Sequence, residues 1–234
     1  MILVLAGTTE GREAAVALER QGQKVITATA TAYGGELLKK DFKGEISDRP
    51  LNTGEMLQFI ERRGITRVID ATHPFAVEVS VNARAACRKA GIIYERLERE
   101  SLEAEAGEGV IIACNSEEAV QLAASAEGSI FLTVGSSKLE QYTAGLNPQK
   151  LVVRILPVER SLKKCLDLGI PPKNIIAMQG PFSEEINRAL FRRFGPSLVI
   201  TKESGSTGGT AEKISAARAL SIPIVLIARP TGAQ

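Results

Sequence analysis

The sequence predicts an α/β protein made of two Rossmann-like, parallel-sheet domains that face each other across a cleft. Three observations predict this class. Apolar runs of four to six residues alternate with segments of helical periodicity, the pattern of parallel strands joined by crossover helices. The first strand runs directly into a Gly/Thr-rich turn and then a helix. One acidic, polar segment, residues 98–109, interrupts the alternation and predicts a linker.

The elements follow from these patterns in order. The first domain is expected to span residues 1–97, with strands at 1–6, 24–29, 67–71 and 92–95 and helices near 9–21, 52–63 and 75–90. Gly22, Gly64 and Gly91 each follow a predicted helix, where glycine commonly ends helices. The second domain is expected to span residues 110–234, with strands near 110–113, 130–133, 151–155, 174–178, 198–201 and 223–228 and helices near 115–125, 158–168, 183–194 and 210–220. One continuous sheet through both halves is the alternative.

Composition narrows the class of protein. The chain is 44% hydrophobic and 24% charged, as in ordinary soluble globular proteins. A net charge of +2 is too small to indicate a nucleic-acid partner. Cys87, Cys114 and Cys165 form no Cys-x-x-Cys pair, and the chain has one histidine, so we expect buried thiols in a reducing cytosol and no metal site. No apolar run is long enough to cross a membrane and no signal peptide is recognisable, which predicts a cytoplasmic protein without a membrane partner.

The turn after the first strand is the first candidate site. Gly7, Thr8, Thr9 and Glu10 lie where backbone N–H groups at a helix N-terminus can bind an anion, such as a nucleotide phosphate. The spacing is Gly7-x-x-x-Gly11, which differs from the common Gly-x-Gly-x-x-Gly dinucleotide motif. A purely structural turn is therefore the alternative.

The end of the second strand bears on the choice of cofactor. Thr29, Tyr33 and Gly34 follow this strand, and no acid stands where NAD-binding proteins place one to bind the ribose 2′-hydroxyl. A hydroxyl-rich end tolerates a 2′-phosphate, so a dinucleotide bound here is predicted to be NADP(H). The alternative is that these threonines only favour β structure.

The turn after the third strand contains Thr72, His73 and Pro74. We expect Pro74 to open the next helix, with Thr72 or His73 as its cap. His73 is the only histidine and the one candidate catalytic residue. A cap or a packed side chain is the alternative, and within the site an orienting role is favoured over proton donation.

Two turns and the last strand's end carry the candidate sites of the second domain. The predicted residues for binding substrate or phosphate are Gly135, Ser136, Lys138, Lys202, Ser204, Gly205, Gly208 and Arg229. Glycines, hydroxyls and a lysine before a helix suit an anion, but the turn at 201–209 does not match a Walker A motif. A solvent-exposed loop with no ligand is the alternative.

Several short motifs, taken in order, resemble one family. They are Gly-Thr-Thr-Glu at 7–10, Ala-Thr-His-Pro-Phe-Ala at 71–76, Tyr94-Glu95-Arg96, Gly-Pro-Phe at 180–182, Thr-Lys-Glu-Ser-Gly at 201–205 and Arg229-Pro230. Together they are similar to the precorrin-6A reductases of cobalamin biosynthesis. The resemblance implies NADPH-dependent reduction of precorrin-6A, or of its cobalt form, with hydride delivered to C19 and a proton to C18. It also implies a tetrapyrrole substrate, and it leaves open contacts with other enzymes of the pathway.

Two other functions are weighed against this one. A non-catalytic nucleotide-sensing domain shares the first loop but has no need of the second glycine-rich turn at 204–209. An S-adenosylmethionine-dependent methyltransferase also uses a glycine loop after its first strand, but it usually has an acid where Thr29 and Thr31 stand here. The residues alone do not choose between the cobalt-containing and cobalt-free substrate, identify the proton donor or give the oligomeric state.

Overall fold

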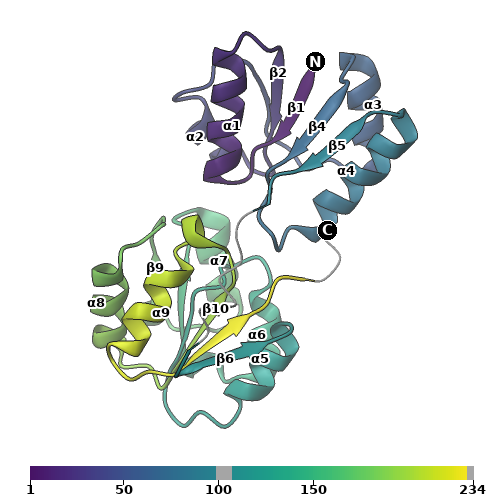
Figure 1. The fold of residues 1–234 in the computed structure, drawn as a ribbon. Helices are drawn as coiled ribbons and strands as arrows, with labels where there is room; N and C mark the ends of the chain where they lie inside the picture. Colours follow the sequence, from purple (N-terminus) through teal and green to yellow (C-terminus); the bar gives the residue numbers. More distant parts are fainter. Residues whose placement is uncertain (99–106, 231–234) are drawn as a thin grey trace. The chain divides into compact units, whose positions relative to one another are not determined.

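The chain divides into two compact units. The computed structural model describes residues 1–98 and 107–230, and Figure 1 shows the ribbon. Unit 1 contains residues 1–98 together with Pro230, and unit 2 contains residues 107–229. The predicted linker at 98–109 lies for most of its length, 99–106, outside the described residues. The predicted limits of the domains, 1–97 and 110–234, stay predictions.

Unit 1 holds a five-stranded parallel sheet in the order β3-β2-β1-β4-β5. Its strands are β1 (Ile2–Leu5), β2 (Val25–Ala28), β3 (Glu45–Ser47), β4 (Arg67–Asp70) and β5 (Ile93–Arg96). Its helices are α1 (Thr9–Arg20), α2 (Ala32–Leu38), α3 (Thr53–Arg63) and α4 (Val77–Ala90). This is the doubly wound Rossmann order, 3-2-1-4-5-6, without its sixth strand.

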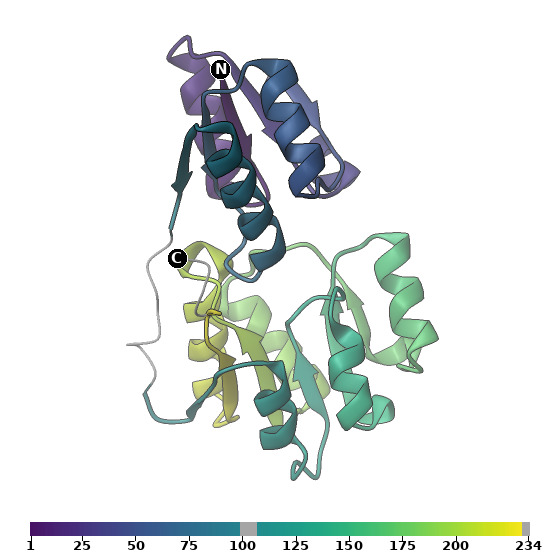
Figure 2. The ribbon, with the colours of Figure 1, turned by 90° about the vertical axis from the view of Figure 1, so that its right-hand side faces the viewer.

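Helices cover both faces of this sheet, and its central strand β1 is apolar throughout. On one face Ala15 of α1 and Leu38 of α2 pack against Ile2 and Val4 of β1. On the other, α3 and α4 lie side by side (Figure 2) and cover the second face of the same strands. Burial on both faces explains why β1 and β2 read as continuous apolar runs without alternation.

Unit 2 holds a six-stranded parallel sheet in the order β6-β11-β10-β7-β8-β9. Its strands are β6 (Val110–Ala113), β7 (Ile130–Leu132), β8 (Leu151–Ile155), β9 (Ile175–Ala177), β10 (Leu198–Lys202) and β11 (Ile224–Ile227). Its helices are α5 (Ser116–Ala123), α6 (Leu139–Gly145), α7 (Glu159–Asp167), α8 (Glu184–Phe194) and α9 (Thr210–Arg218). Two separate sheets confirm the predicted pair of parallel α/β domains and exclude the single continuous sheet.

Most predicted elements are present, and the differences have local causes. Helix α2, strand β3 and helix α6 were not predicted because each is only 3 to 7 residues long and carries little periodicity. Gly64 and Gly91 end α3 and α4 in the left-handed conformation, as expected. The helix expected near 75–90 begins at Val77, so Pro74 does not open it and neither Thr72 nor His73 is its N-cap.

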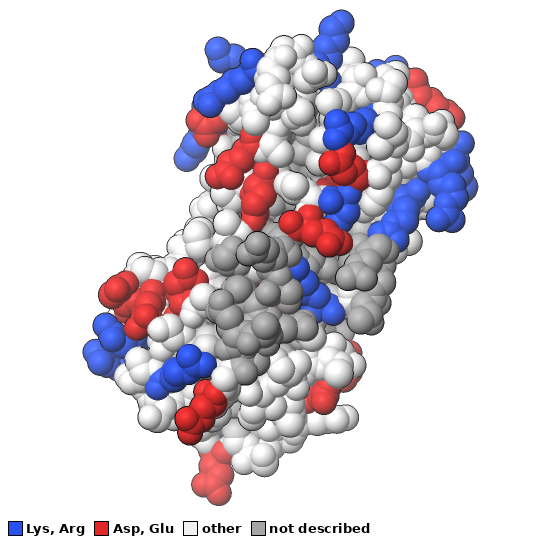
Figure 3. Space-filling view, viewed as in Figure 1, with Lys and Arg blue, Asp and Glu red and all other residues white. Residues whose placement is uncertain are grey.

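Charges of both signs are spread over the face drawn in Figure 3, in keeping with the small net charge. Within the residues that the structure describes, no helix is both long and apolar enough to span a membrane. In that same part of the chain, no three His, Cys, Asp or Glu side chains group as metal ligands.

Candidate functional site

The sheet of unit 1 reverses its direction of growth between β1 and β4. From β1 the chain moves outward to β2 and β3, then returns to the other side of β1 for β4 and β5. Open α/β sheets bind ligands outside the carboxyl ends of the strands at such a switch point. The predicted cofactor-binding residues fall on the loops after β1, β2 and β4, three adjacent strands: Gly7, Thr8, Thr9, Glu10, Thr29, Tyr33, Gly34, Thr72, His73 and Pro74.

Thr8 joins the two loops that flank this switch point. Its hydroxyl accepts a hydrogen bond from the Gly11 N–H (3.2 Å), which caps α1, and donates one to the Ala71 carbonyl (2.8 Å). Gly7 is exposed, and a Cβ on it would lie 3.7 Å from Thr72 Cα, an ordinary contact. Packing within the chain therefore does not require glycine at position 7, whereas a missing side chain there leaves the backbone open to a ligand.

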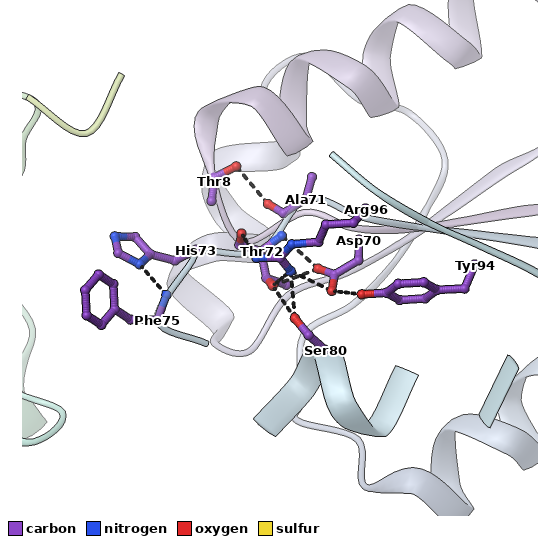
Figure 4. Close-up of polar contacts among 9 residues, drawn as sticks. All are labelled: Thr8, Asp70, Ala71, Thr72, His73, Phe75, Ser80, Tyr94 and Arg96. Atoms are coloured by element: carbon purple, nitrogen blue, oxygen red, sulfur yellow. Dashed lines mark hydrogen bonds and ion pairs between the residues drawn. The ribbon is translucent and has the colours of Figure 1, made fainter. Parts of the chain in front are cut away.

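A buried carboxylate organises the end of β4 (Figure 4). Asp70 is fully buried, and its Oδ1 accepts hydrogen bonds from the Thr72 N–H (3.0 Å) and hydroxyl (2.7 Å). Its Oδ2 accepts from the Tyr94 hydroxyl (2.7 Å) and pairs with Arg96 (2.6 Å). The Arg96 guanidinium also donates to the Thr72 hydroxyl (2.9 Å), the Thr72 carbonyl (3.3 Å) and the Ser80 hydroxyl (2.6 Å). The conformation of residues 70–72 is thus fixed by side chains of β5 and α4.

The protonation state of this network is stable near neutral pH. Burial by itself would raise the pKa of Asp70, but hydrogen bonds from Ser80 and Thr72 and the charge of Arg96 outweigh it and lower the pKa. Burial, with the hydrogen bond to Asp70, raises the pKa of Tyr94 to about 12. Asp70 is therefore ionised and Tyr94 neutral, and the network holds its loop across the physiological pH range.

His73 follows directly after the anchored segment. Its Nδ1 accepts a hydrogen bond from the Phe75 N–H (3.2 Å), and its carbonyl accepts one from the Ala76 N–H (2.8 Å). This turn through Pro74 delays the start of α4 to Val77 and explains the wrong prediction of the helix start. Because Nδ1 accepts this hydrogen bond, the proton of a neutral imidazole would be on Nε2.

The loop after β2 adds a second helix N-terminus to this edge. The Thr31 hydroxyl caps α2 by accepting from the Gly34 N–H (3.1 Å), and the Thr29 hydroxyl donates to the Thr31 carbonyl (3.0 Å). Two charged residues on the same edge were missed. Ala28 aligns with Ser47 of β3, which places the exposed Asp48 and Arg49 beside the end of β2. Only a correct prediction of β3 would have found them.

Unit 2 has a switch point of its own, between β7 and β10. The chain moves from β7 outward to β8 and β9, and then returns to the other side of β7 for β10 and β11. The predicted residues of this unit fall on three adjacent strand ends: Gly135, Ser136 and Lys138 after β7; Lys202, Ser204, Gly205 and Gly208 at β10; and Arg229 after β11. Both sets of predicted residues therefore lie where the topology places ligands, each set within its own unit.

A buried carboxylate also organises the end of β10. Glu203 is fully buried, its Oε1 accepts a hydrogen bond from the Gly205 N–H (2.9 Å) and its Oε2 pairs with Arg229. The Ser204 N–H donates to the Thr210 hydroxyl (3.1 Å). These contacts hold the 203–209 turn against α9. Sequence reasoning missed Glu203, whose only signal is an acid at the end of an apolar strand.

Two lysines stand on adjacent strand ends at the switch point of unit 2. Burial lowers the pKa of Lys202, and the charge of Lys138 lowers it further. The loop that carries Lys138 is tied to α7, because Ser136 and Ser161 share a hydrogen bond (2.8 Å) and Lys164 donates to the Ser137 carbonyl (2.6 Å). An anion bound by both lysines would offset the effect of the Lys138 charge on Lys202.

Two further cations in unit 2 are buried, and sequence reasoning missed both. Arg154 and Lys213 are each 7% exposed. Arg154 donates to the Asn187 side-chain carbonyl (2.8 Å) and stacks 4.2 Å from the centre of the Phe182 ring, while Lys213 donates to the Gly208 carbonyl (3.0 Å). Burial lowers the pKa of Arg154 to about 10 and, with the charge of Arg154, that of Lys213 to about 7. Both cations support the turns that surround the end of β10.

Known proteins share the whole of this architecture. A family profile described as "Precorrin-6x reductase CbiJ/CobK" matches residues 1–234. The chain belongs to the precorrin-6x reductase family. A cobalt-precorrin-6A reductase of Priestia megaterium is 40% identical over 98% of this chain and 91% of its own length. One of Methanothermobacter thermautotrophicus is also 40% identical, over 98% of this chain and 76% of its own length.

Relatives named precorrin-6A reductase are also similar, and a solved structure agrees in fold. A precorrin-6A reductase of Rhodobacter capsulatus is 30% identical over 98% of this chain and 88% of its own length. The solved structure named CobK precorrin-6A reductase superposes with a TM-score of 0.80, at 28% identity, covering 98% of this chain and 88% of its own.

As a precorrin-6x reductase, the protein is an oxidoreductase of cobalamin biosynthesis. This sets aside the nucleotide-sensing domain and the methyltransferase that the sequence left open. Each unit of this reductase presents one switch point with an anchored loop, the kind of position at which open α/β sheets bind ligands.

Proposed function

We propose that this protein reduces cobalt-precorrin-6A with NADPH, adding a hydride and a proton across one double bond of the macrocycle. The observation that carries the proposal is the first switch point, where exposed Gly7 and the N-terminus of α1 lie beside an anchored second loop. NADPH fits these residues. A Cβ at Gly7 would occupy the approach to the turn, and the α1 N-terminus offers N–H donors to a pyrophosphate.

The residues of unit 1 bind and orient. When bound, NADPH supplies the hydride that the reduction needs. Gly7 and Thr9 hold the phosphates at the α1 N-terminus, while His73 donates a hydrogen bond from Nε2 to orient the cofactor or the macrocycle. Rigid positioning is the main contribution expected of the protein, since hydride transfer depends on alignment of the two reacting carbons. The hydrogen bonds from the Thr8 hydroxyl to the Ala71 carbonyl and from the Thr72 N–H to Asp70 contribute to that rigidity.

The choice of NADPH rests on the strand end next to β1. Thr29 and Thr31 replace the acid that would repel a 2′-phosphate, and Arg49 at the end of β3 supplies a cation on the same edge. Asp48 beside it is an acid, so the preference depends on Arg49 binding the phosphate with a charge-assisted hydrogen bond.

Unit 2 binds the carboxylates of the macrocycle. The charge of Lys138 lowers the pKa of Lys202, and a carboxylate of the macrocycle would be attracted to both ammonium groups. We assign the cobalt-containing form as substrate because the relatives that are 40% identical carry that name, while those named for the metal-free form are 30% and 28% identical.

The test is an anaerobic assay of NADPH oxidation with cobalt-precorrin-6A and with metal-free precorrin-6A. We expect turnover with the cobalt form to exceed turnover with the metal-free form. The reverse order would reassign the substrate, and no oxidation with either would overturn the proposed reduction.

A lysine variant tests the macrocycle site. Lys202→Ala should raise KM for the macrocycle and leave the Kd of NADPH unchanged. Lys163→Ala is the matched control, because the Lys163 side chain is 70% exposed and, among the described residues, its ion pair is with Asp167 one helical turn away. If Lys202→Ala behaves like Lys163→Ala in both constants, the turn at 201–209 is not a ligand site.

A further inference from the structure

The two units repeat one arrangement of a buried acid and an arginine. In unit 1 the acid is Asp70, at the end of β4, and in unit 2 it is Glu203, directly after β10. Both β4 and β10 lie next to the switch point of their sheet, on the side to which the chain returns. The two acids are both fully buried.

Each acid makes the same two contacts. One carboxylate oxygen accepts a hydrogen bond from the backbone N–H two residues further on, which is Thr72 for Asp70 (3.0 Å) and Gly205 for Glu203 (2.9 Å). The other oxygen pairs with an arginine of the neighbouring strand on the side away from the switch point, which is Arg96 at the end of β5 for Asp70 and Arg229 after β11 for Glu203. We call Asp70 with Arg96 the first clamp, and Glu203 with Arg229 the second clamp.

Both clamps act on the turn that faces a ligand. The first bends residues 70–72 back on themselves and leads directly into His73. The second bends residues 203–205 and leads into the 206–208 turn and α9. The arginines reach the carboxylates with side chains that are 11% and 21% exposed, so solvent screens neither pair strongly.

An exposed pair between the same strands shows the contrast. Arg67 of β4 pairs with Glu95 of β5, but these side chains are 39% and 49% exposed and touch no ligand-facing turn. Such surface pairs contribute little. Burying an acid–arginine pair costs desolvation free energy that a pair of apolar side chains would avoid. The contribution of the buried pair here is therefore to fix one conformation of the turn.

We propose that the two clamps are equivalent positioning devices that divide the ligands between them. Resting on the proposed function, the first clamp sets the affinity for NADPH, and the second sets the affinity for the carboxylates of the macrocycle. Arg96 and Arg229 are positioning residues that act through Asp70 and Glu203. Each guanidinium needs its planar fork to hold the carboxylate, so lysine is not an equivalent replacement.

The test compares conservative variants in the full-length protein. Arg96→Lys should raise the Kd of NADPH, measured by nicotinamide fluorescence without the macrocycle, by about tenfold, the loss expected for one misplaced charge-assisted hydrogen bond. Its KM for the macrocycle should stay within about twofold. Arg229→Lys should show the converse. Arg67→Ala and Arg188→Ala are the controls, because both arginines form exposed pairs, and circular dichroism and thermal unfolding check that every variant is folded.

Double variants separate positioning from direct contact. If Arg229 acts through Glu203, then Glu203→Gln raises KM for the macrocycle as Arg229→Lys does, and the double variant is no worse than either. For the first clamp, Asp70→Asn should raise the Kd of NADPH as Arg96→Lys does, and the double variant should be no worse than either. Additive effects, or an unchanged constant in Glu203→Gln, would show direct ligand contact and overturn the clamp.

The assignment of one ligand to each clamp can be refuted independently of the proposed function. Variants of either clamp that raise both constants equally, or neither, overturn the inference. A wild-type protein that binds NADPH but reduces no macrocycle would refute the proposed function instead, while the NADPH measurements would still decide the first clamp.

Discussion

At the scale of single residues, the unusual feature is the number of charges that unit 2 buries. Arg154 and Lys213 direct their hydrogen bonds to neutral oxygens of Asn187 and Gly208. A cation in that setting loses more hydration than it regains, which is why the pKa of each is lowered. These residues are therefore sources of pH-dependent stability.

Lys213 should make the protein more stable as the pH rises from 7 to 8.5. Its pKa is about 7 in the folded state, below the ordinary value of 10.5, so above pH 7 the unfolded chain binds more protons. The gain should be at most about 2 kcal/mol by linkage, measured by urea unfolding followed by circular dichroism.

The predicted rise in stability is limited to pH values below 8.5 because a cysteine titrates above that value. The pKa of Cys87 is raised by burial to about 11, so above the ordinary thiol pKa this group opposes the trend. Lys213→Met, which keeps the apolar stem, should abolish the rise, and Lys163→Met should keep it. A rise that survives in Lys213→Met would assign it to another group.

His73→Asn should keep most of kcat. The His73 Nδ1 accepts a hydrogen bond from the Phe75 N–H, and an asparagine amide is also able to make an orienting hydrogen bond. Steady-state kinetics of His73→Asn and His73→Ala check this, with the alanine variant expected to be the weaker one. A fall of about 10²-fold or more in the asparagine variant, with loss of any inflection in the pH profile near neutrality, would instead identify His73 as the proton donor.

At the scale of elements, the turn from β1 to α1 contains two glycines with opposite roles. A Cβ on Gly11 would lie 2.9 Å from Ala6 Cα and 3.0 Å from Ala71 Cβ, so this glycine lets α1 pack closely on the sheet. A Cβ on Gly7 meets only ordinary contacts. The motif Gly7-x-x-x-Gly11 therefore combines one open position with one packing position.

The two glycines should respond differently to substitution. Gly11→Ala should lower the free energy of unfolding by about 1–3 kcal/mol, because backbone and a buried methyl must move apart. Gly7→Val should leave thermal unfolding almost unchanged but weaken NADPH binding, since its side chain occupies the approach to the turn. Unaltered NADPH affinity in Gly7→Val would make the turn purely structural.

At the scale of the whole molecule, two sheets of different size share one design. Each sheet has one switch point, between β1 and β4 in unit 1 and between β7 and β10 in unit 2. The candidate ligand residues lie on the strand ends around it. A protein with two such edges can assign one ligand to each unit, as a reductase with a cofactor and a large substrate requires. The choice of cofactor is then decided by the strand ends of unit 1.

NADPH should bind more tightly than NADH, and Arg49→Ala should remove the difference. The expected loss in NADPH affinity is about tenfold or more, from one charge-assisted hydrogen bond to the 2′-phosphate, with NADH affinity unchanged. Fluorescence titration with both nucleotides measures this, and Arg62→Ala, in the last turn of α3, is the control. Tighter binding of NADH by the wild type would refute the argument from Thr29 and Arg49.

The sequence by itself determined the alternation of strands and helices, most element limits and the loops that carry the candidate residues. It did so because apolar runs and glycine ends are local signals, clearest where a strand is buried on both faces, as in β1 and β10. It also determined the family, because motifs from Gly7 to Arg229 keep their order along the chain.

Only the tertiary structure decided what those residues do together. The order of strands in a sheet is not a local property, so neither switch point nor the neighbours Asp70 and Arg96 could be deduced from spacing. Short elements such as β3 and α6 gain their stability from packing rather than from periodicity. Buried charges such as Glu203 and Lys213 look like surface residues in the sequence, because burial is decided by elements far away along the chain.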